Sequence, residues 1–269
     1  MILVELRKLL SRPRTWVTIG LLDALPTLVA VLLAVTDLAP RPGTGPAFLS
    51  AVLSDGTLFP LAALGIVLPL FLPIAVAIQA GESIAGEAQG GTLRYLLVRP
   101  VGRTRLLVAK LVGVIAFVVL AVLVVAGTAY ITGSLLLGDQ PLATTSVSGS
   151  ALSSAEVAQR SALAIGYVML SMLGVAAVAL FLSTVTDTPL SAALGALALL
   201  IASTLLLTLD AADALAPYLP TRYWLAFVDL FRDPIFWRDV IRGVLQQGAY
   251  VLVFLGAAWA NFATKDITS

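Results

Sequence analysis

Long apolar runs constrain the fold of this chain more strongly than any other feature of its sequence. Crossing the roughly 30 Å hydrocarbon core of a membrane takes a helix of about 20 mostly apolar residues, since each residue rises about 1.5 Å. The clearest run carries one charge, Lys110, close enough to an end for its ammonium group to extend toward water. We expect six transmembrane helices, over residues 16–35, 58–80, 106–132, 161–182, 189–209 and 244–263.

The composition supports the same class of protein and excludes several functions. Hydrophobic residues make up 59% of the 269 residues and charged residues 12%, which leaves too little polar surface to cover a soluble domain. The absence of cysteine and histidine excludes disulfides, thiolate or imidazole metal sites and imidazole general bases. A net charge of +1 argues against a nucleic-acid partner, because phosphate binding needs clustered positive charge. We therefore expect an all-α membrane protein with a single domain over residues 1–269.

The distribution of basic residues predicts the orientation in the membrane. With six spans, both termini and the segment 81–110 lie on one side, and that side holds ten of the sixteen basic residues. Lysine and arginine accumulate in cytoplasmic segments, so we place this side in the cytoplasm. The frequent use of alanine, leucine, valine and arginine with little lysine is typical of a GC-rich bacterial genome, which favours a bacterial cytoplasmic (inner) membrane.

Residues 1–14 have the pattern of a helix that lies on the membrane surface. Apolar residues recur at helical spacing, mostly basic residues fill the remaining positions, and Pro13 marks a bend into the first span. We expect an amphipathic elbow helix here. The alternative is a basic segment that only orients the first span.

Local signals also mark the later spans and the loops between them. Ser153 and Glu156 form a capping-box pattern before the fourth span, and Thr188 with Pro189 is a favourable start for the fifth. The segment 210–243 is rich in aromatic residues, which prefer the headgroup layer, and is broken by prolines. There we expect one or two short outer helices, re-entrant or interfacial, folded against the bundle between the fifth and sixth spans. A plain interfacial anchor is the alternative.

The densest charge lies in residues 81–110, between the second and third spans. Glu82 and Glu87 continue the second helix, and a pair of glycines ends it. We expect Thr92 to cap a second short helix, with leucines on one face, that ends before Pro100. An apolar stripe on a short polar connector indicates a docking surface, either for the base of the bundle or for a separate protein.

The sequence GEAQGGTLRYLLVRPVGRTRLLVAK resembles the cytoplasmic segment between the second and third spans of type-2 ABC transporter permeases. The general plan of that family, with an elbow helix, six spans and short outer helices before the last span, also fits nearly the whole chain. In the family this segment forms a coupling helix, which transmits movement from a cytoplasmic ATPase to the membrane helices. The resemblance implies that residues 81–105 are the coupling segment. The residues that we assign to ATPase coupling are Glu82, Glu87, Gly91, Thr92, Leu93, Leu96, Leu97, Pro100 and Arg103.

The resemblance implies partners as well as a role. No Gly-x-x-x-x-Gly-Lys-Ser/Thr sequence is present, so the chain lacks that route to nucleotide binding and is not expected to be an enzyme or to hold a cofactor. ATP and Mg²⁺ would be bound by two separate cytoplasmic ABC ATPase subunits, and the chain would pair with a second copy or a related permease. The implied function is the membrane-spanning permease subunit of an ATP-driven exporter. The alternatives are a permease-like module of a signalling or maturation complex and a membrane protein with no link to ATP.

Acidic residues outside this segment carry weaker signals. Asp23 lies within the first span, where a charge costs about 3 kcal/mol unless it faces protein or is protonated. We expect it in the translocation path or in a helix-pairing contact, and the alternative is a hydrated position near the interface. Asp210 and Asp213 have the spacing of a metal pair, but no further ligands accompany them and we expect no metal. The scarcity of charge in the spans favours an amphipathic or lipid-like substrate that enters from the bilayer.

Overall fold

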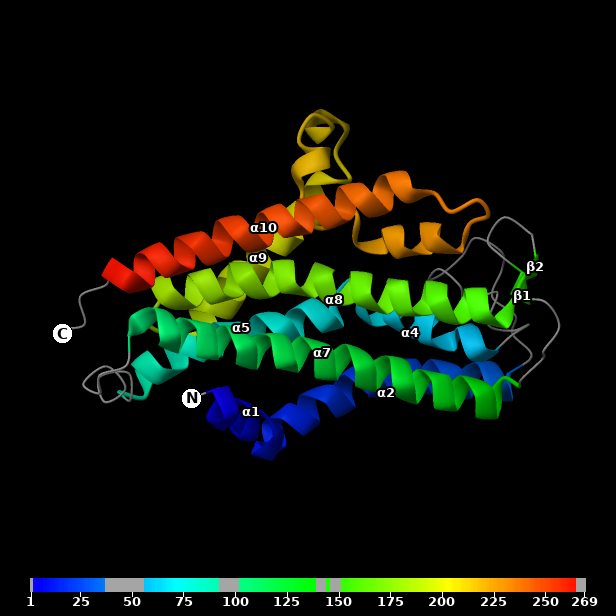
Figure 1. Ribbon diagram of the computed structural model, residues 1–269, viewed down its shortest axis with the longest axis horizontal. Coiled ribbons are helices and arrows are strands. Elements are labelled where there is room, and N and C mark those ends of the chain that lie inside the picture. The colour runs from blue at the N-terminus through cyan, green and yellow to red at the C-terminus, as the bar shows by residue number, and fades with distance from the viewer. Residues whose placement is uncertain (1, 37–55, 92–101, 139–143, 146–150, 265–269) are drawn as a thin grey trace.

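The computed structural model describes residues 2–36, 56–91, 102–138, 144–145 and 151–264, which form a bundle of long helices (Figure 1). Within these ranges, the only sheet is an antiparallel pair of two-residue strands, β1 (Thr144–Thr145) and β2 (Ala151–Leu152). The expected all-α architecture is confirmed for the described residues apart from this short pair. The α-helices are α1 (Ile2–Ser11), α2 (Pro13–Val35), α4 (Phe59–Val67), α5 (Phe71–Gln89), α7 (Arg103–Leu136), α8 (Ser154–Val185), α9 (Pro189–Leu206) and α10 (Trp237–Thr264).

Helices long enough to cross a membrane account for most of the described chain. α2, α7, α8, α9 and α10 each have the length and hydropathy of a span, and α4 with α5 does so as a bent pair. Each of the six predicted stretches overlaps one of these, so the chain is a multi-pass membrane protein with five or six spans. Several limits differ from the prediction, because α7 continues to Leu136, α9 ends at Leu206 and α10 starts at Trp237.

The second span is not the continuous helix over residues 58–80 that hydropathy predicts. It is divided at residues 68–70 into α4, preceded by the 3-10 helix η1 (Gly56–Leu58), and α5, with an angle of 62° between the halves. Pro69 and Pro73 explain the break, because a proline has no amide hydrogen to donate to the carbonyl four residues earlier. The expected second span is therefore two helices.

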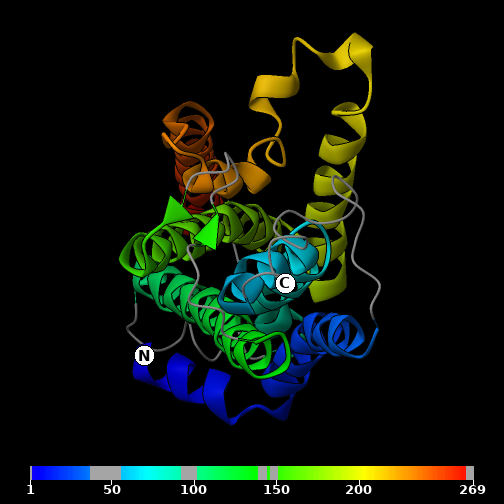
Figure 2. The ribbon, with the colours of Figure 1, turned by 90° about the vertical axis from the view of Figure 1, so that its right-hand side faces the viewer.

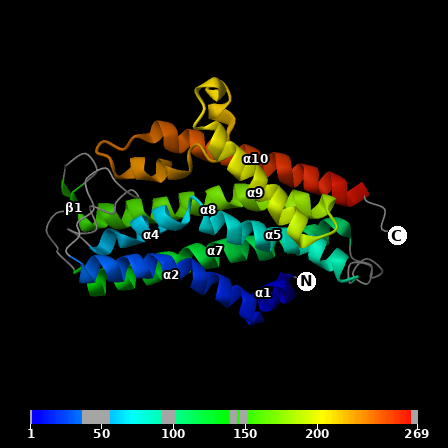
Figure 3. The same cartoon turned by 180° about the vertical axis from the view of Figure 1, so that it is seen from behind.

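α8 lies at the centre of the bundle and packs against α5, α7, α9 and α10. α7 also contacts α1, α2 and α4, as the view along the long axis in Figure 2 shows. α9 packs against α5 and α8 and then diverges from the bundle toward its end (Figure 3). The largest fully buried side chains include Phe59, Phe117, Met172 and Phe227. Because lipid is as apolar as these groups, close packing rather than exclusion from water holds the helices together.

The sequence signals for two helix starts are confirmed. The Ser153 hydroxyl accepts from the Glu156 amide at 3.3 Å, and the Glu156 carboxylate accepts from the Ser153 amide at 2.8 Å, which completes the capping box of α8. Thr188 caps α9 by accepting from the Ser191 amide at 3.3 Å, and Pro189 is the first residue of that helix. Both helices therefore begin where a side chain satisfies an amide that lacks an intrahelical partner.

The segment 210–243 holds three short 3-10 helices in place of the one or two helices that we expected. Arg160 of α8, only 8% exposed, donates to the Leu230 and Arg232 carbonyls at 3.2 and 2.9 Å. The segment is thus fixed to the bundle, as predicted, while its re-entrant or interfacial character stays a prediction. The three helices are η2 (Asp210–Ala212), η3 (Ala216–Tyr218) and η4 (Trp224–Phe231).

Candidate functional site

The predicted coupling residues that precede residues 92–101 in the sequence lie at the charged end of α5. α5 continues through Glu82 and Glu87 to Gln89, which confirms that both acids extend the second span. Gly91 follows with φ of +66°, a left-handed conformation that glycine adopts without strain and that ends the helix. Five predicted residues lie outside the described ranges, so the short apolar helix stays a prediction; they are Thr92, Leu93, Leu96, Leu97 and Pro100.

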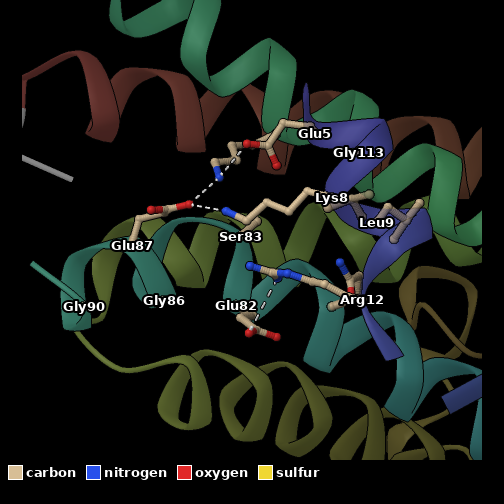
Figure 4. Close-up of a pocket in the computed structure, with 13 residues that line it drawn as sticks. Glu5, Lys8, Leu9, Arg12, Glu82, Ser83, Gly86, Glu87, Gly90 and Gly113 are labelled. Atoms are coloured by element: carbon tan, nitrogen blue, oxygen red, sulfur yellow. Dashed lines mark hydrogen bonds and ion pairs between the residues drawn. The ribbon is translucent and has the colours of Figure 1, made fainter. Parts of the chain in front are cut away.

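Glu87 lies at the centre of an ion-pair network that joins three helices (Figure 4). Its Oε1 atom is 2.9 Å from Nζ of Lys8 on α1 and 2.9 Å from Nζ of Lys110 on α7. Nζ of Lys110 is also 3.0 Å from Oε1 of Glu5 on α1. The Lys110 side chain is 5% exposed and that of Glu87 15%, so these charges are largely removed from water. The network therefore binds α1 and α7 to the end of α5.

The prediction that Lys110 extends toward water is wrong. Its ammonium group is buried and has the carboxylates of Glu5 and Glu87 as partners. A buried cation without a partner is unfavourable, and two carboxylates at hydrogen-bond distance offset that cost. Lys110 thus contributes to the joining of helices rather than to an interfacial anchor.

The start of α2 supplies a second ion pair beside the first. α1 ends at Ser11, Arg12 is extended and Pro13 begins α2, so the bend predicted at the proline is present. The Arg14 guanidinium approaches the Glu82 carboxylate to 2.7 Å, and that of Arg12 lies 4.0 Å from it. The Arg14 side chain is 60% exposed, so water screens this pair and it contributes little to stability. That α1 lies on a membrane surface stays a prediction.

A cavity of about 320 Å³ lies between α1, α5 and α7 beside these ion pairs (Figure 4). Three carboxylates and three basic side chains line it, so the charged groups of its wall balance. A balanced set can exchange ion-pair partners when the helices shift, but it does not select a strongly anionic or cationic ligand. The described residues contain no cluster of three or more acidic side chains placed to bind a metal. The charged lining residues are Glu5, Lys8, Arg12, Glu82, Glu87 and Lys110.

Arg103, a predicted coupling residue at the start of α7, contacts the end of α10. Its guanidinium donates to the Ala263 carbonyl at 2.9 Å and to the Phe262 carbonyl at 3.5 Å. A cation stabilises the last carbonyls of a helix, which have no intrahelical donors. The neighbouring Thr104 hydroxyl accepts from the indole of Trp259 at 3.0 Å. The start of α7 is therefore fixed to the end of α10.

Asp23, the candidate for the translocation path, lies at the contact between α2 and α7. The Thr128 hydroxyl of α7 is 2.6 Å from its Oδ1 atom, and the Asp23 side chain is half-buried. The carboxyl group faces protein, as expected, and a hydrogen bond of this kind holds two membrane helices together. Helix pairing is thus supported, whereas a place in a translocation path stays a prediction.

The sequence reasoning missed the basic partners of the two glutamates. We assigned Glu82 and Glu87 to the site, but placed Lys8 and Arg12 only among the basic positions of a helix on the membrane surface. The pair between Lys8 and Glu87 joins residues 79 positions apart, which no local pattern displays. A usable signal is the single acid, Glu5, among the basic residues of α1, because it indicates a partner cation elsewhere.

Comparison with known proteins gives a family and a local relative. The family described as "Protein of unknown function (DUF2705)" matches residues 33–268, and the chain belongs to it. A relative from Stutzerimonas stutzeri, "Probable ABC transporter permease protein NosY", is 37% identical over 76 residues. This match covers 28% of the chain and 28% of the relative. The chain is therefore a multi-pass membrane protein with local similarity to an ABC transporter permease.

Proposed function

We propose that the chain is the membrane-spanning permease subunit of an ATP-driven ABC exporter. The observation that carries the proposal is the Glu87 network, which joins α1, α5 and α7. α5 precedes the segment 92–101 in the sequence, and α7 follows it. The sequence around that network resembles the coupling segment of type-2 ABC permeases. The local similarity to the permease NosY supports the same class.

The network provides a physical means of transmitting movement. α5 ends at Gln89 and α7 begins at Arg103, so a partner that displaces the residues between them acts on both helices. Because Glu87 is bonded to Lys8 and Lys110, α1 is displaced with them. A partner that binds one arrangement of these helices more tightly than another shifts the population toward it. The two arrangements in this proposal are open to the inside and open to the outside.

The mechanism requires partner subunits. Two cytoplasmic ABC ATPases bind ATP and Mg²⁺ and supply the energy, and this chain takes no part in hydrolysis. A second copy of the chain, or a related permease, completes the translocation path. The complex lies in a bacterial cytoplasmic membrane with both termini of the chain in the cytoplasm, and its substrate is amphipathic or lipid-like, because the spans carry few charges.

Affinity purification of the tagged chain from its native cells in mild detergent tests the proposal. We expect a stoichiometric ATPase with the wild-type chain, and its loss or uncoupling with Glu87→Ala and with Leu96→Arg. Glu156→Ala is the matched control, because Glu156 is an exposed glutamate in the capping box of α8. Recovery of the intact chain from several detergents without a nucleotide-binding partner would refute the proposal.

A second measurement separates an exporter from a permease-like module of a signalling or maturation complex. ATP hydrolysis by the purified complex is measured in lipid nanodiscs with a panel of amphipathic compounds and with a strongly ionic one. An exporter of amphipathic substrates is expected to respond to a compound of the first kind. A module that moves nothing is expected to hydrolyse ATP at the same rate throughout.

A further inference from the structure

The buried hydroxyl of Ser183 contacts the backbone of a neighbouring helix at three points. Ser183 lies on α8 and is 1% exposed. Its Oγ atom donates to the Gly81 carbonyl of α5 at 2.6 Å and accepts from the Ile84 and Ala85 amides at 3.1 and 2.9 Å. In a regular helix the Ala85 amide donates to the Gly81 carbonyl, so the hydroxyl is placed at that bond. A side chain of α8 thus shares in the hydrogen bonding that keeps α5 helical.

The preceding bond of α5 is shared in a similar way. The Ser83 hydroxyl donates to the Ala80 carbonyl at 2.6 Å, and in a regular helix that carbonyl accepts from the Ile84 amide. Serine side chains that bond to their own helix weaken and bend it, and a side chain that enters the ladder of backbone bonds marks a point at which a helix bends. All four backbone groups of two consecutive helical bonds therefore have hydroxyl partners.

Glycine adds to the weakness of this stretch, because α9 packs too closely for a side chain at Gly81. A Cβ atom on Gly81 would lie 3.0 Å from the Ala193 amide nitrogen and 3.2 Å from the Pro189 carbonyl oxygen. α9 thus leaves no room for a side chain at Gly81, and a second glycine, Gly86, follows in the next turn. Glycine destabilises a helix relative to alanine because it gains more freedom when the helix opens. α5 is held here by its neighbours as well as by its own bonds.

Hydrogen bonds join the part of α8 around Ser183 to α10 and, through α10, to α7. Thr184, the next residue of α8, accepts from Nδ2 of Asn261 on α10 at both its carbonyl and its hydroxyl, at 3.0 Å each. The end of α10 is in turn bonded to Arg103 at the start of α7. α7, α8 and α10 are therefore joined to one another beside residues 80–85 of α5.

We propose that residues 80–85 of α5 form a hinge and that Ser183 sets its angle. Glu87 lies less than one turn beyond the hinge and carries the ion pairs to Lys8 and Lys110, so the hinge angle places the charged cluster relative to the membrane part of α5. Ser183 is a positioning residue that acts through the backbone of α5. The inference rests on the proposed function, in which movement at residues 92–101 is transmitted to the span through this stretch.

Spin labels on the full chain in lipid nanodiscs test the hinge without any partner. The chain contains no cysteine, so Gln89→Cys at the exposed end of α5 and Leu135→Cys near the far end of α7 give one labelled pair. We expect Ser183→Ala to broaden the distribution of distances between the labels. We also expect roughly fivefold faster amide exchange in residues 80–87, which is the effect of losing about one net hydrogen bond.

Two further variants make the test specific. Ser183→Thr keeps the hydroxyl group and is expected to restore both wild-type readouts. Ser171→Ala is the matched control, because Ser171 is equally buried on α8 but donates to Tyr167 of its own helix, at 3.0 Å. The hinge is overturned if Ser183→Ala behaves like Ser171→Ala at residues 80–87, or if its effect spreads evenly over all helices.

Failure of the hinge and failure of the permease function are distinguishable. If an ATPase copurifies, Ser183→Ala is expected to retain it but to lose the nucleotide-dependent change in the distance between Gln89→Cys and Leu135→Cys. Retention of that change with Ser183→Ala would overturn the positioning role. If no ATPase copurifies, the proposed function fails, while the measurements on the chain alone still decide whether residues 80–85 form a hinge.

Discussion

Among the charged residues that the structure describes, Lys110 is the least exposed to water. Its Nζ atom is 3.0 Å from Glu5 and 2.9 Å from Glu87, and its loss leaves two carboxylates without their shared cation. We expect Lys110→Met to destabilise the folded chain by about 2 kcal/mol, less than for a fully buried pair, because both carboxylates keep some contact with water. Reversible unfolding in nanodiscs, followed by steric trapping, measures the loss.

Arg14→Met is the matched control for this prediction. Arg14 also pairs with a carboxylate, that of Glu82 at 2.7 Å, but its side chain is mostly exposed. Pairs in water contribute little, so the expected change is within about 0.5 kcal/mol. Equal losses for the two variants would contradict the argument that burial decides the strength of each pair.

Among the helices, the end of α5 depends on one residue in a left-handed conformation. Gly91 has φ of +66°, whereas Gly90, the capping residue before it, has φ of −77°. A Cβ atom is unfavourable in the first conformation and tolerated in the second. We expect Gly91→Ala to destabilise the chain by about 1 kcal/mol and Gly90→Ala to change its stability by less than about 0.5 kcal/mol. The same unfolding measurement is made on each single variant. A larger loss of stability for Gly90→Ala than for Gly91→Ala would contradict the observed end of α5.

The ends of elements could be predicted where a signal acts within a few residues. The capping box at Ser153 and the proline at position 189 mark helix starts in the sequence because their partners lie within one turn. The break in the second span was missed, although Pro69 is visible in the sequence. Hydropathy averages over about 20 residues, and one missing amide does not change that average.

The contacts between elements lay beyond sequence reasoning for a different reason. Lys110 and Glu5 are 105 positions apart, and the bonds of Ser183 to α5 span about as many. Which side chains meet depends on how α1 crosses α7 and how α5 packs on α8, and hydropathy contains neither. The charge of residues 81–110 was sufficient to indicate where the candidate site lies. The pairing within it required the packed structure.

Across the whole molecule, the number of helices between two points decides which side of the membrane each one faces. α7, α8 and α9 separate Gln89 from Asp213, and both residues are exposed. If each of the three helices crosses the bilayer, the two residues lie on opposite sides. The excess of basic residues around α1 and residues 81–110 predicts that Gln89 faces the cytoplasm.

Single-cysteine labelling tests this arrangement, because the chain has no cysteine of its own. We expect a membrane-impermeant maleimide to label Asp213→Cys in intact spheroplasts and Gln89→Cys only in inverted vesicles or after permeabilisation. Labelling of both from outside would mean that an even number of the three helices crosses. α9 would then be the first candidate for a helix that does not cross, because it has only 18 residues and diverges from the bundle toward its end (Figure 3).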